Sequence, residues 1–267
     1  MQIGKIPVFI LCGGLGTRLK EMTEFRPKPM IPVGPDPILI HIMKHYASFG
    51  FRRFVLCMGY KSEIIRDYFL NFYAMNSDVT IELKTNGVEV HSVDHSYDWK
   101  VTLAYTGELT MTGARIARAA ERYLGKAEHY AVTYGDGLTD ADLAAEFDFH
   151  LGHGKIGTVL GVNPPSRFGE FHMEGEELVD FVEKPERQSA WINGGYFFFR
   201  REFARYLSSD DGCVLERDPL ANLARDRQLA VFQHRSFWAC MDTQRDHEYL
   251  TNLWESGDPP WARGPGG

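Results

Sequence analysis

The chain has 267 residues, of which 44% are hydrophobic, and its formal charge is −7. This composition supplies a buried core and differs from that of disordered proteins. Because there is no basic excess to neutralise a phosphate backbone, the charge argues against nucleic-acid partners. The sequence shows neither a signal pattern nor an apolar run of membrane-spanning length, so we expect a cytoplasmic protein with no membrane partner. Four isolated cysteines are expected to be reduced thiols.

The first elements expected along the chain alternate between strand and helix. A buried strand at 6–11 precedes a helix at 38–49, and a strand at 54–58 precedes a helix that Ser62 caps and that extends to residue 69. The helix at 38–49 has apolar residues at helical spacing and is followed by Gly50, which suits a helix end. This alternation predicts a Rossmann-like α/β fold with a mostly parallel central sheet flanked by helices.

Residues 73–108 interrupt this alternation. Three short runs there, at 79–83, 88–90 and 100–104, have the alternating polarity of strands. We expect a β-rich insertion that either extends the sheet or forms subunit contacts. No linker divides the rest, so residues 1–267 are expected to form a single domain.

The second half of the chain continues with strands and helices, and ends in a tail at 257–267 that is rich in Pro and Gly and expected to be loosely held. The expected elements are helices at 111–124 (capped by Thr112), 140–150 (capped by Thr139), 202–207, 214–226 and 244–255, and strands at 129–134, 157–162, 169–173, 178–183, 195–200 and 229–233.

A glycine-rich loop follows the first strand directly. Three glycines lie within residues 13–16, Arg18 ends the loop, and Lys28 follows between two prolines. Glycine backbones fold tightly and bring N–H groups against an anion. The spacing matches neither a dinucleotide fingerprint nor a Walker A loop. A plain tight turn is the alternative, but the two nearby cations favour a nucleoside triphosphate site.

Two aspartates are expected at the ends of strands. Asp136 lies between two glycines after the strand at 129–134, and Asp242 precedes the last helix. Ligands of open α/β sheets bind at the carboxyl ends of strands, where two carboxylates suit Mg²⁺ held together with phosphates. The alternatives are an Asp-Gly turn for Asp136 and a helix cap for Asp242.

Two further polar residues suggest a site for a second substrate, in which Lys184 could hold a phosphate and Asn193 could hydrogen-bond sugar hydroxyls. Lys184 follows a predicted strand and Asn193 precedes two glycines, although surface lysines and Asn-Gly turns are common. The histidine pairs 91/95 and 150/153 lack a third ligand, so zinc is not expected.

With these residues identified, the chain resembles the sugar-1-phosphate nucleotidyltransferases. Their signature, G-G-x-G-T-R-L followed by P-K-P, is matched by residues 13–19 and 27–29. Within the family the resemblance is strongest to the glucose-1-phosphate cytidylyltransferases and covers nearly the full length. Further matches lie at 41–44, 111–113, 133–137, 167–169, 183–185, 192–195, 237–238 and 241–243.

The resemblance implies a Mg²⁺-dependent transfer of CMP from CTP to α-D-glucose 1-phosphate, giving CDP-glucose and pyrophosphate for surface polysaccharide such as the O-antigen of lipopolysaccharide. It also implies a homo-oligomer, a hexamer by family resemblance. The site residues it implies are the catalytic pair Lys28 and Arg18; the nucleotide-binding residues Leu11, Cys12, Gly13, Gly14, Leu15, Gly16, Thr17, Arg18, Lys28, Thr110, Arg115 and Gly135; the sugar-phosphate-binding residues Gly169, Glu183, Lys184 and Asn193; and the metal ligands Asp136 and Asp242.

The sequence departs from its relatives at two places. Cys12 stands where relatives commonly have Ala, and residues 186–190 keep no detail that fixes the sugar. The same fold using dTTP, UTP or another sugar phosphate therefore stays open, as does a sugar-nucleotide sensor without catalysis. A sensor would be expected to lose Lys28 or an aspartate, and all three are present.

Overall fold

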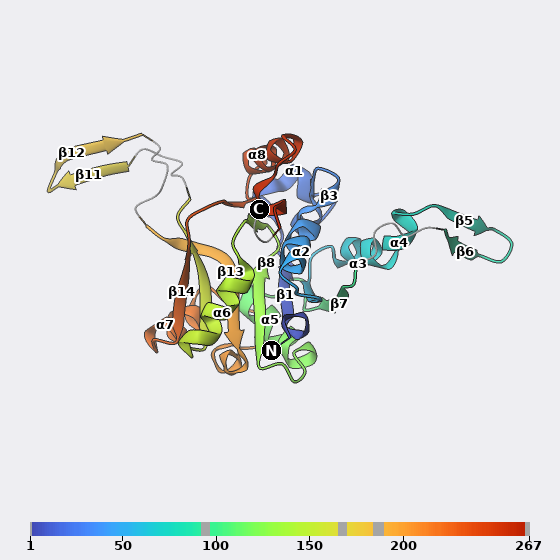
Figure 1. The fold of residues 1–267 in the computed structure, drawn as a ribbon, viewed down its shortest axis with the longest axis horizontal. Coiled ribbons are helices and arrows are strands. Elements are labelled where there is room, and N and C mark those ends of the chain that lie inside the picture. Colours follow the sequence, from blue (N-terminus) through green and yellow to red (C-terminus); the bar gives the residue numbers. More distant parts are fainter. Residues whose placement is uncertain (1, 92–96, 165–169, 184–189, 265–267) are drawn as a thin grey trace.

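The computed structural model describes residues 2–91, 97–164, 170–183 and 190–264. Its centre is a seven-stranded sheet in the order β14-β10-β13-β8-β1-β4-β7 (Figure 1). Only β13 pairs antiparallel with its neighbours β8 and β10, and the other pairings are parallel. The strands are β1 (Pro7–Cys12), β4 (Arg53–Met58), β7 (Lys100–Tyr105), β8 (His129–Tyr134), β10 (Gly157–Val162), β13 (Ile192–Arg200) and β14 (Leu229–His234). The predicted fold class is confirmed.

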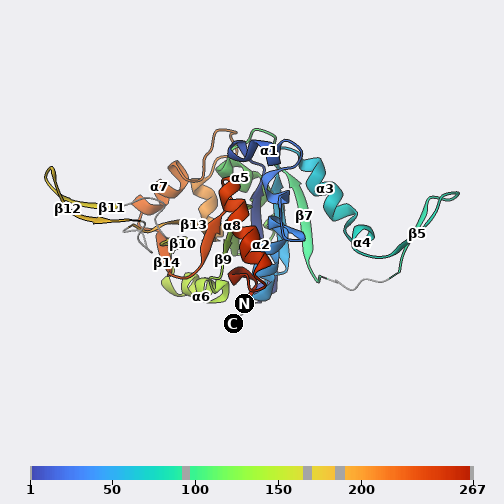
Figure 2. The same cartoon turned by 90° about the horizontal axis from the view of Figure 1, so that it is seen from above.

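Strand β1 lies in the interior of the sheet and is buried along its whole length. Val8 and Ile10 belong to one core, and Phe9 and Leu11 to the other. Helices cover both faces of the sheet, as Figure 2 shows from above. The first face carries α2 (Ile38–Ser48), α3 (Ser62–Leu70), α6 (Leu143–His153) and α8 (Gln244–Glu255), and the second carries α5 (Thr112–Tyr123) and α7 (Asp218–Arg225). Burial on both faces explains why these strands are continuous apolar runs.

Three predicted helix caps are wrong. Ser62 is the first helical residue of α3, and the cap position is Lys61 in the left-handed conformation with φ 51°. Thr112 likewise lies inside α5, and its hydroxyl accepts a hydrogen bond from the backbone of Leu215 at 2.9 Å. Thr139 lies in a short strand, and α6 is capped instead by Asp142.

Two hairpins project from opposite sides of the sheet in Figures 1 and 2. One consists of β5 (Val79–Glu82) and β6 (Gly87–Val90), and the other of β11 (Glu170–Glu174) and β12 (Glu177–Val182). The first hairpin leads into β7, which is the edge strand of the central sheet. The last strand of the predicted insertion therefore extends the sheet, and the hairpin before it does not.

The remaining short elements connect these parts. They are α1 (Lys20–Thr23), α4 (Phe72–Met75), β2 (Pro32–Val33), β3 (Asp36–Pro37), β9 (Gly137–Thr139), β15 (Trp238–Cys240) and 3₁₀ turns at 3–5, 17–19, 28–30, 201–206 and 260–262. The helix predicted at 214–226 is shorter than expected, because α7 begins only at Asp218, beside a proline in its first turn.

The tail is packed more firmly than expected. Trp261 is 2% exposed, and its indole N–H donates to Nδ1 of His41 at 3.3 Å. The prediction of a loosely held tail is therefore wrong for this residue.

All four cysteines are free, as expected. Among the described residues, the helices are too short or too polar to cross a membrane.

Candidate functional site

Lys28 lies where three segments of the chain meet. Its Nζ donates to Oδ2 of Asp136 and to Oδ1 of Asp242, each at 2.6 Å. The residue begins a 3₁₀ turn between Pro27 and Pro29, whose rings restrict the backbone. Burial by itself would lower the pKa of Lys28, but the charges and hydrogen bonds of the two aspartates outweigh it and raise that pKa. The side chain is therefore an ammonium at neutral pH.

Asp136 is held at the end of β8 by close backbone packing. A Cβ on the preceding Gly135 would lie 2.7 Å from the carbonyl oxygen of Leu11 and 2.8 Å from Cγ of Pro29, so no larger residue fits without a shift. The carbonyl of Asp136 accepts a hydrogen bond of 2.8 Å from the N–H of Met241. This bond ties the end of β8 to the end of β15.

Asp242 is not the cap of α8. The cap is Thr243, which forms a capping box with Asp246. The Asp242 carboxylate instead contacts Lys28 and, through Oδ2, accepts a hydrogen bond from Arg18 at 3.1 Å. The two strand-end aspartates therefore converge on one cation, as their predicted positions require.

The three glycines of the loop have different roles. Gly16 has φ 62°, and a Cβ there would lie 2.7 Å from Thr23. A Cβ on Gly13 would lie 2.2 Å from the guanidinium of Arg115, whereas one on Gly14 would meet nothing within 4 Å. Packing thus requires Gly13 and Gly16, while Gly14 faces open space. A pocket beside the loop is lined by Gly16, Thr17, Arg18, Lys28 and Asp242.

Arg115 and Thr110 lie outside this pocket. The Arg115 guanidinium is buried behind the loop and donates to the carbonyl of Gly13 at 2.9 Å. Thr110 is also buried, and its hydroxyl donates to Asp211 at 2.6 Å. The structure therefore does not bring these two predicted nucleotide-binding residues into the pocket with Lys28.

The other nucleotide-site predictions lie at the end of β1 and in the loop. Leu11 and Cys12 are buried, and Leu15 is 45% exposed. Burial raises the pKa of the Cys12 thiol well above its usual value, so this thiol is poorly ionised and unreactive at neutral pH.

The predicted sugar-phosphate residues are only partly described. Asn193 lies at the start of β13, where its Nδ2 donates to the hydroxyl of Tyr134 at 3.4 Å and its Oδ1 accepts from Gly195 at 2.8 Å. Glu183 is exposed and follows β12, whose hairpin projects from the sheet (Figure 1). Gly169 and Lys184 lie outside the described residues.

Sequence reasoning missed one residue beside Asn193. The hydroxyl of Tyr134 donates to Glu216, which also accepts a hydrogen bond of 2.8 Å from Thr112. Glu216 lies in an irregular segment before α7, so no motif or periodicity pointed to it.

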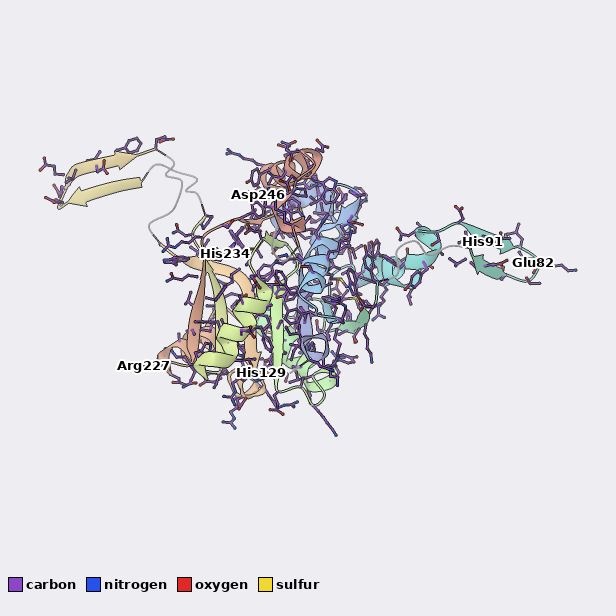
Figure 3. The ribbon with its side chains drawn as sticks, viewed as in Figure 1. Glu82, His91, His129, Arg227, His234 and Asp246 are labelled. Carbon is purple, nitrogen blue, oxygen red and sulfur yellow. The ribbon has the colours of Figure 1, made fainter. Side chains whose placement is uncertain are left out.

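The donor set at Lys28 suits a hard divalent cation. Two carboxylates converge there, and Mg²⁺ is commonly held by one or two carboxylates together with substrate phosphates and water. Within the described ranges, no group of three or more His, Cys, Asp or Glu side chains could hold a metal. Figure 3 places His91 beside the β5–β6 hairpin and His129 in the body of the molecule, where Nδ1 of His129 lies 3.0 Å from Nε2 of His150.

Comparisons with known proteins identify the family of this chain. The nucleotidyl transferase family model matches residues 7–243. Glucose-1-phosphate cytidylyltransferases from Salmonella typhi and Salmonella typhimurium are each 44% identical over 252 residues, which is 94% of this chain and 97% of theirs. The crystal structure of HddC from Yersinia pseudotuberculosis has the same fold, with a TM-score of 0.66 at 21% identity over 93% of this chain and 99% of that one. The predicted family is confirmed: the chain belongs to the nucleotidyl transferases and is an enzyme of that kind.

Proposed function

We propose that this enzyme is a glucose-1-phosphate cytidylyltransferase, which transfers CMP from CTP to α-D-glucose 1-phosphate and releases pyrophosphate. The structural observation that carries the proposal is the convergence of Lys28, Asp136 and Asp242 beside a glycine loop that ends in Arg18. The 44% identity to cytidylyltransferases over 94% of the chain supports cytidine as the base and glucose as the sugar.

The residues of the pocket suit an in-line attack of the sugar phosphate on the α-phosphorus of CTP. The attacking oxygen is already anionic at neutral pH, so no general base is needed. Catalysis then depends on positioning and charge stabilisation. Lys28, Arg18 and the N–H groups around Gly14 would neutralise the triphosphate, and Asn193 and Lys184 would hold the sugar phosphate. Asp136 and Asp242 would hold Mg²⁺, which, when bound, neutralises charge on the phosphates.

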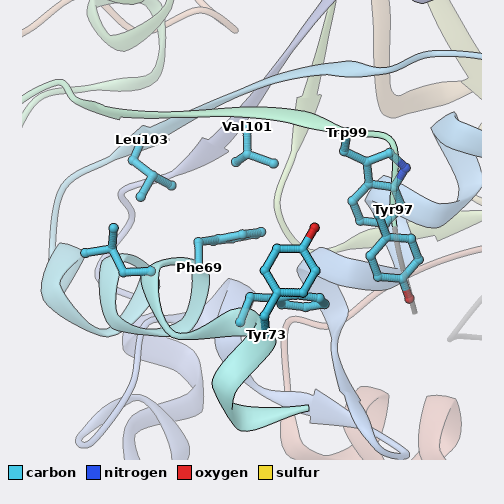
Figure 4. Close-up of a pocket in the computed structure, with 8 residues that line it drawn as sticks. Phe69, Tyr73, Tyr97, Trp99, Val101 and Leu103 are labelled. Atoms are coloured by element: carbon cyan, nitrogen blue, oxygen red, sulfur yellow. The ribbon is translucent and has the colours of Figure 1, made fainter. Parts of the chain in front are cut away.

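A homo-oligomer in the cytoplasm is part of the proposal. An apolar pocket opens between helices α3 and α4 and strand β7 (Figure 4). Leu70, which lines it, is 77% exposed, and Met75 at the end of α4 is 79% exposed. Exposed apolar patches of this kind mark protein–protein contacts. The pocket is lined by Phe69, Leu70, Phe72, Tyr73, Tyr97, Trp99, Val101 and Leu103. We assign the product, CDP-glucose, to the synthesis of surface polysaccharide.

Pyrophosphate release tests the assignment of both substrates. CTP, dTTP, UTP and GTP are each supplied with glucose 1-phosphate and Mg²⁺, and CTP with several other sugar 1-phosphates. The expected result is the highest kcat/KM with CTP and glucose 1-phosphate. A preference for dTTP or UTP would show that the enzyme uses that nucleotide in place of CTP. Nucleotide binding without pyrophosphate release under any condition would favour a non-catalytic sensor.

A further inference from the structure

The ammonium of Lys28 stands where the charge of a bound cation would stand. Its Nζ lies 2.6 Å from an oxygen of Asp136 and 2.6 Å from an oxygen of Asp242. The side chain of Lys28 is only 13% exposed, and those of the two aspartates are 26% and 34% exposed. The carboxylate pair is therefore already neutralised in part by a cation from the chain itself.

We propose that Lys28 is an internal competitor for the metal site, so that the carboxylate pair binds a divalent cation well only after a triphosphate has drawn the ammonium away. This inference rests on the proposed function, because it takes Asp136 and Asp242 as the metal ligands. It goes beyond that function by coupling the binding of metal to the binding of nucleotide through one side chain.

The electrostatics of the site require this coupling. A divalent cation that bound without nucleotide would lie within a few ångströms of the Lys28 ammonium, which repels it. It would also replace that ammonium as the partner of the two carboxylates. A partly buried charge that loses its partners is strongly unfavourable. A triphosphate in the adjacent pocket supplies new anionic partners, and the exchange then leaves neither cation uncompensated.

The local chain geometry permits the exchange without backbone movement. The flanking prolines and the 3₁₀ turn fix the backbone at Lys28. The side chain has four rotatable carbon–carbon bonds, so Nζ can turn from the aspartates toward the part of the pocket lined by Gly16 and Thr17. The exchange therefore requires movement of the Lys28 side chain only.

Arg18 cannot replace Lys28 in this role. Its side chain is 74% exposed, and it reaches Oδ2 of Asp242 at 3.1 Å. An ion pair this exposed is weakened by water and salt. Removal of Arg18 should therefore change metal affinity much less than removal of the Lys28 charge.

Binding of Mn²⁺ in the absence of nucleotide tests the proposal. Mn²⁺ serves as a paramagnetic probe, and its free concentration is read by electron paramagnetic resonance for the full-length wild type, Lys28→Met and Lys44→Met. The matched control Lys44 also pairs with an aspartate, Asp36, at 2.5 Å, but lies on α2 outside the site. We expect Lys28→Met to bind free Mn²⁺ at least about tenfold more tightly than the wild type, and Lys44→Met to match the wild type.

A second variant and an activity assay distinguish failure of this inference from failure of the proposed function. If Lys28→Met does not fold, Lys28→Gln keeps a hydrogen-bond donor without the charge and should show the same gain. Equal or weaker Mn²⁺ binding by a folded, uncharged variant would overturn the inference, even if the wild type makes CDP-glucose. A gain in Mn²⁺ affinity together with a wild type that is inactive on every nucleotide would uphold the inference and overturn the proposed function.

Discussion

The carbonyl oxygen of Gly13 accepts a hydrogen bond of 2.9 Å from the buried guanidinium of Arg115. That guanidinium also donates to Thr106 and to the carbonyl groups of Met58, Gly107 and Glu108. One side chain on α5 thus joins the glycine loop to the last residue of β4 and to the segment that follows β7. The loop depends for its shape on a residue that does not line the pocket.

Arg115→Lys should loosen the glycine loop. An ammonium keeps the charge but cannot reproduce the planar fork that serves these acceptors. We expect a loss of about 2–4 kcal/mol in the free energy of unfolding and a rise in KM for the nucleotide that exceeds the fall in kcat. Urea unfolding and steady-state kinetics measure both. Arg122→Lys, an exposed neighbour on the same helix, is the control. Wild-type stability in Arg115→Lys would contradict the role assigned here.

Lys28→Ala should lower the turnover rate at least about tenfold, equivalent to about 1.4 kcal/mol of transition-state stabilisation. The physical reason is the loss of the cation that would neutralise the triphosphate. Steady-state pyrophosphate release at saturating substrates measures the effect, and Lys44→Ala serves as the control. Near-normal turnover in Lys28→Ala would remove its catalytic assignment.

Asp242→Asn and Thr243→Ala separate a metal ligand from a helix cap. The first change removes a carboxylate that contacts Lys28, and the second removes the side chain that caps α8. Asp242→Asn should sharply reduce Mg²⁺-dependent activity. Thr243→Ala should cost about 1 kcal/mol of stability and leave the metal dependence unchanged. Activity across a Mg²⁺ titration and thermal unfolding distinguish the two. If Asp242→Asn keeps the wild-type metal dependence, the metal assignment is wrong.

Glu146 should make the protein less stable as pH rises. It is fully buried, and its two carboxyl oxygens have no hydrogen-bond partner among the described residues. Burial raises its pKa well above the ordinary value of 4.5. Above that value the unfolded chain releases a proton that the folded chain retains, so the free energy of unfolding falls with increasing pH. Glu146→Gln cannot ionise.

The stability gained by Glu146→Gln over the wild type should therefore increase from about pH 5 to about pH 8. Urea unfolding at several pH values measures this difference. Glu121→Gln, at an exposed position on α5, should show no such trend. A difference that stays constant with pH for Glu146→Gln would mean that this group does not ionise differently in the two states.

The parts of the site that were predictable share one property. Each follows a strand. Asp136 and the glycine loop come after the neighbouring parallel strands β8 and β1, so the topology of the central sheet brings them to one edge. Asp242 comes after β15, which pairs with β9 outside that sheet, and the hydrogen bond from Met241 to Asp136 holds it at the same place. The caps were not predictable in this way. The hydroxyl of Thr112 bonds to Leu215 and Glu216, about 100 residues away, and local sequence contains no trace of such partners.

The direction of β13 in the sheet could not be predicted from the sequence either. Its aromatic run predicts a buried strand, but an apolar run has no polarity, and only the pairing with β8 and β10 shows that it is antiparallel. The buried position of Arg115, by contrast, was indicated by the sequence. This arginine interrupts the apolar face of α5 formed by Ala114, Ile116 and Ala119, and a cation on a buried face must find acceptors inside the protein.

The burial of Trp261 sets a condition on how the protein is made. Its ring packs against His41 on α2 and against Phe237. The core around α2 therefore includes a residue that is synthesised more than 200 positions after His41. During translation the earlier part of the chain can collapse, but this part of the core stays open until Trp261 leaves the ribosome. Until then, nascent chains expose the apolar surface of α2, where chaperones can bind.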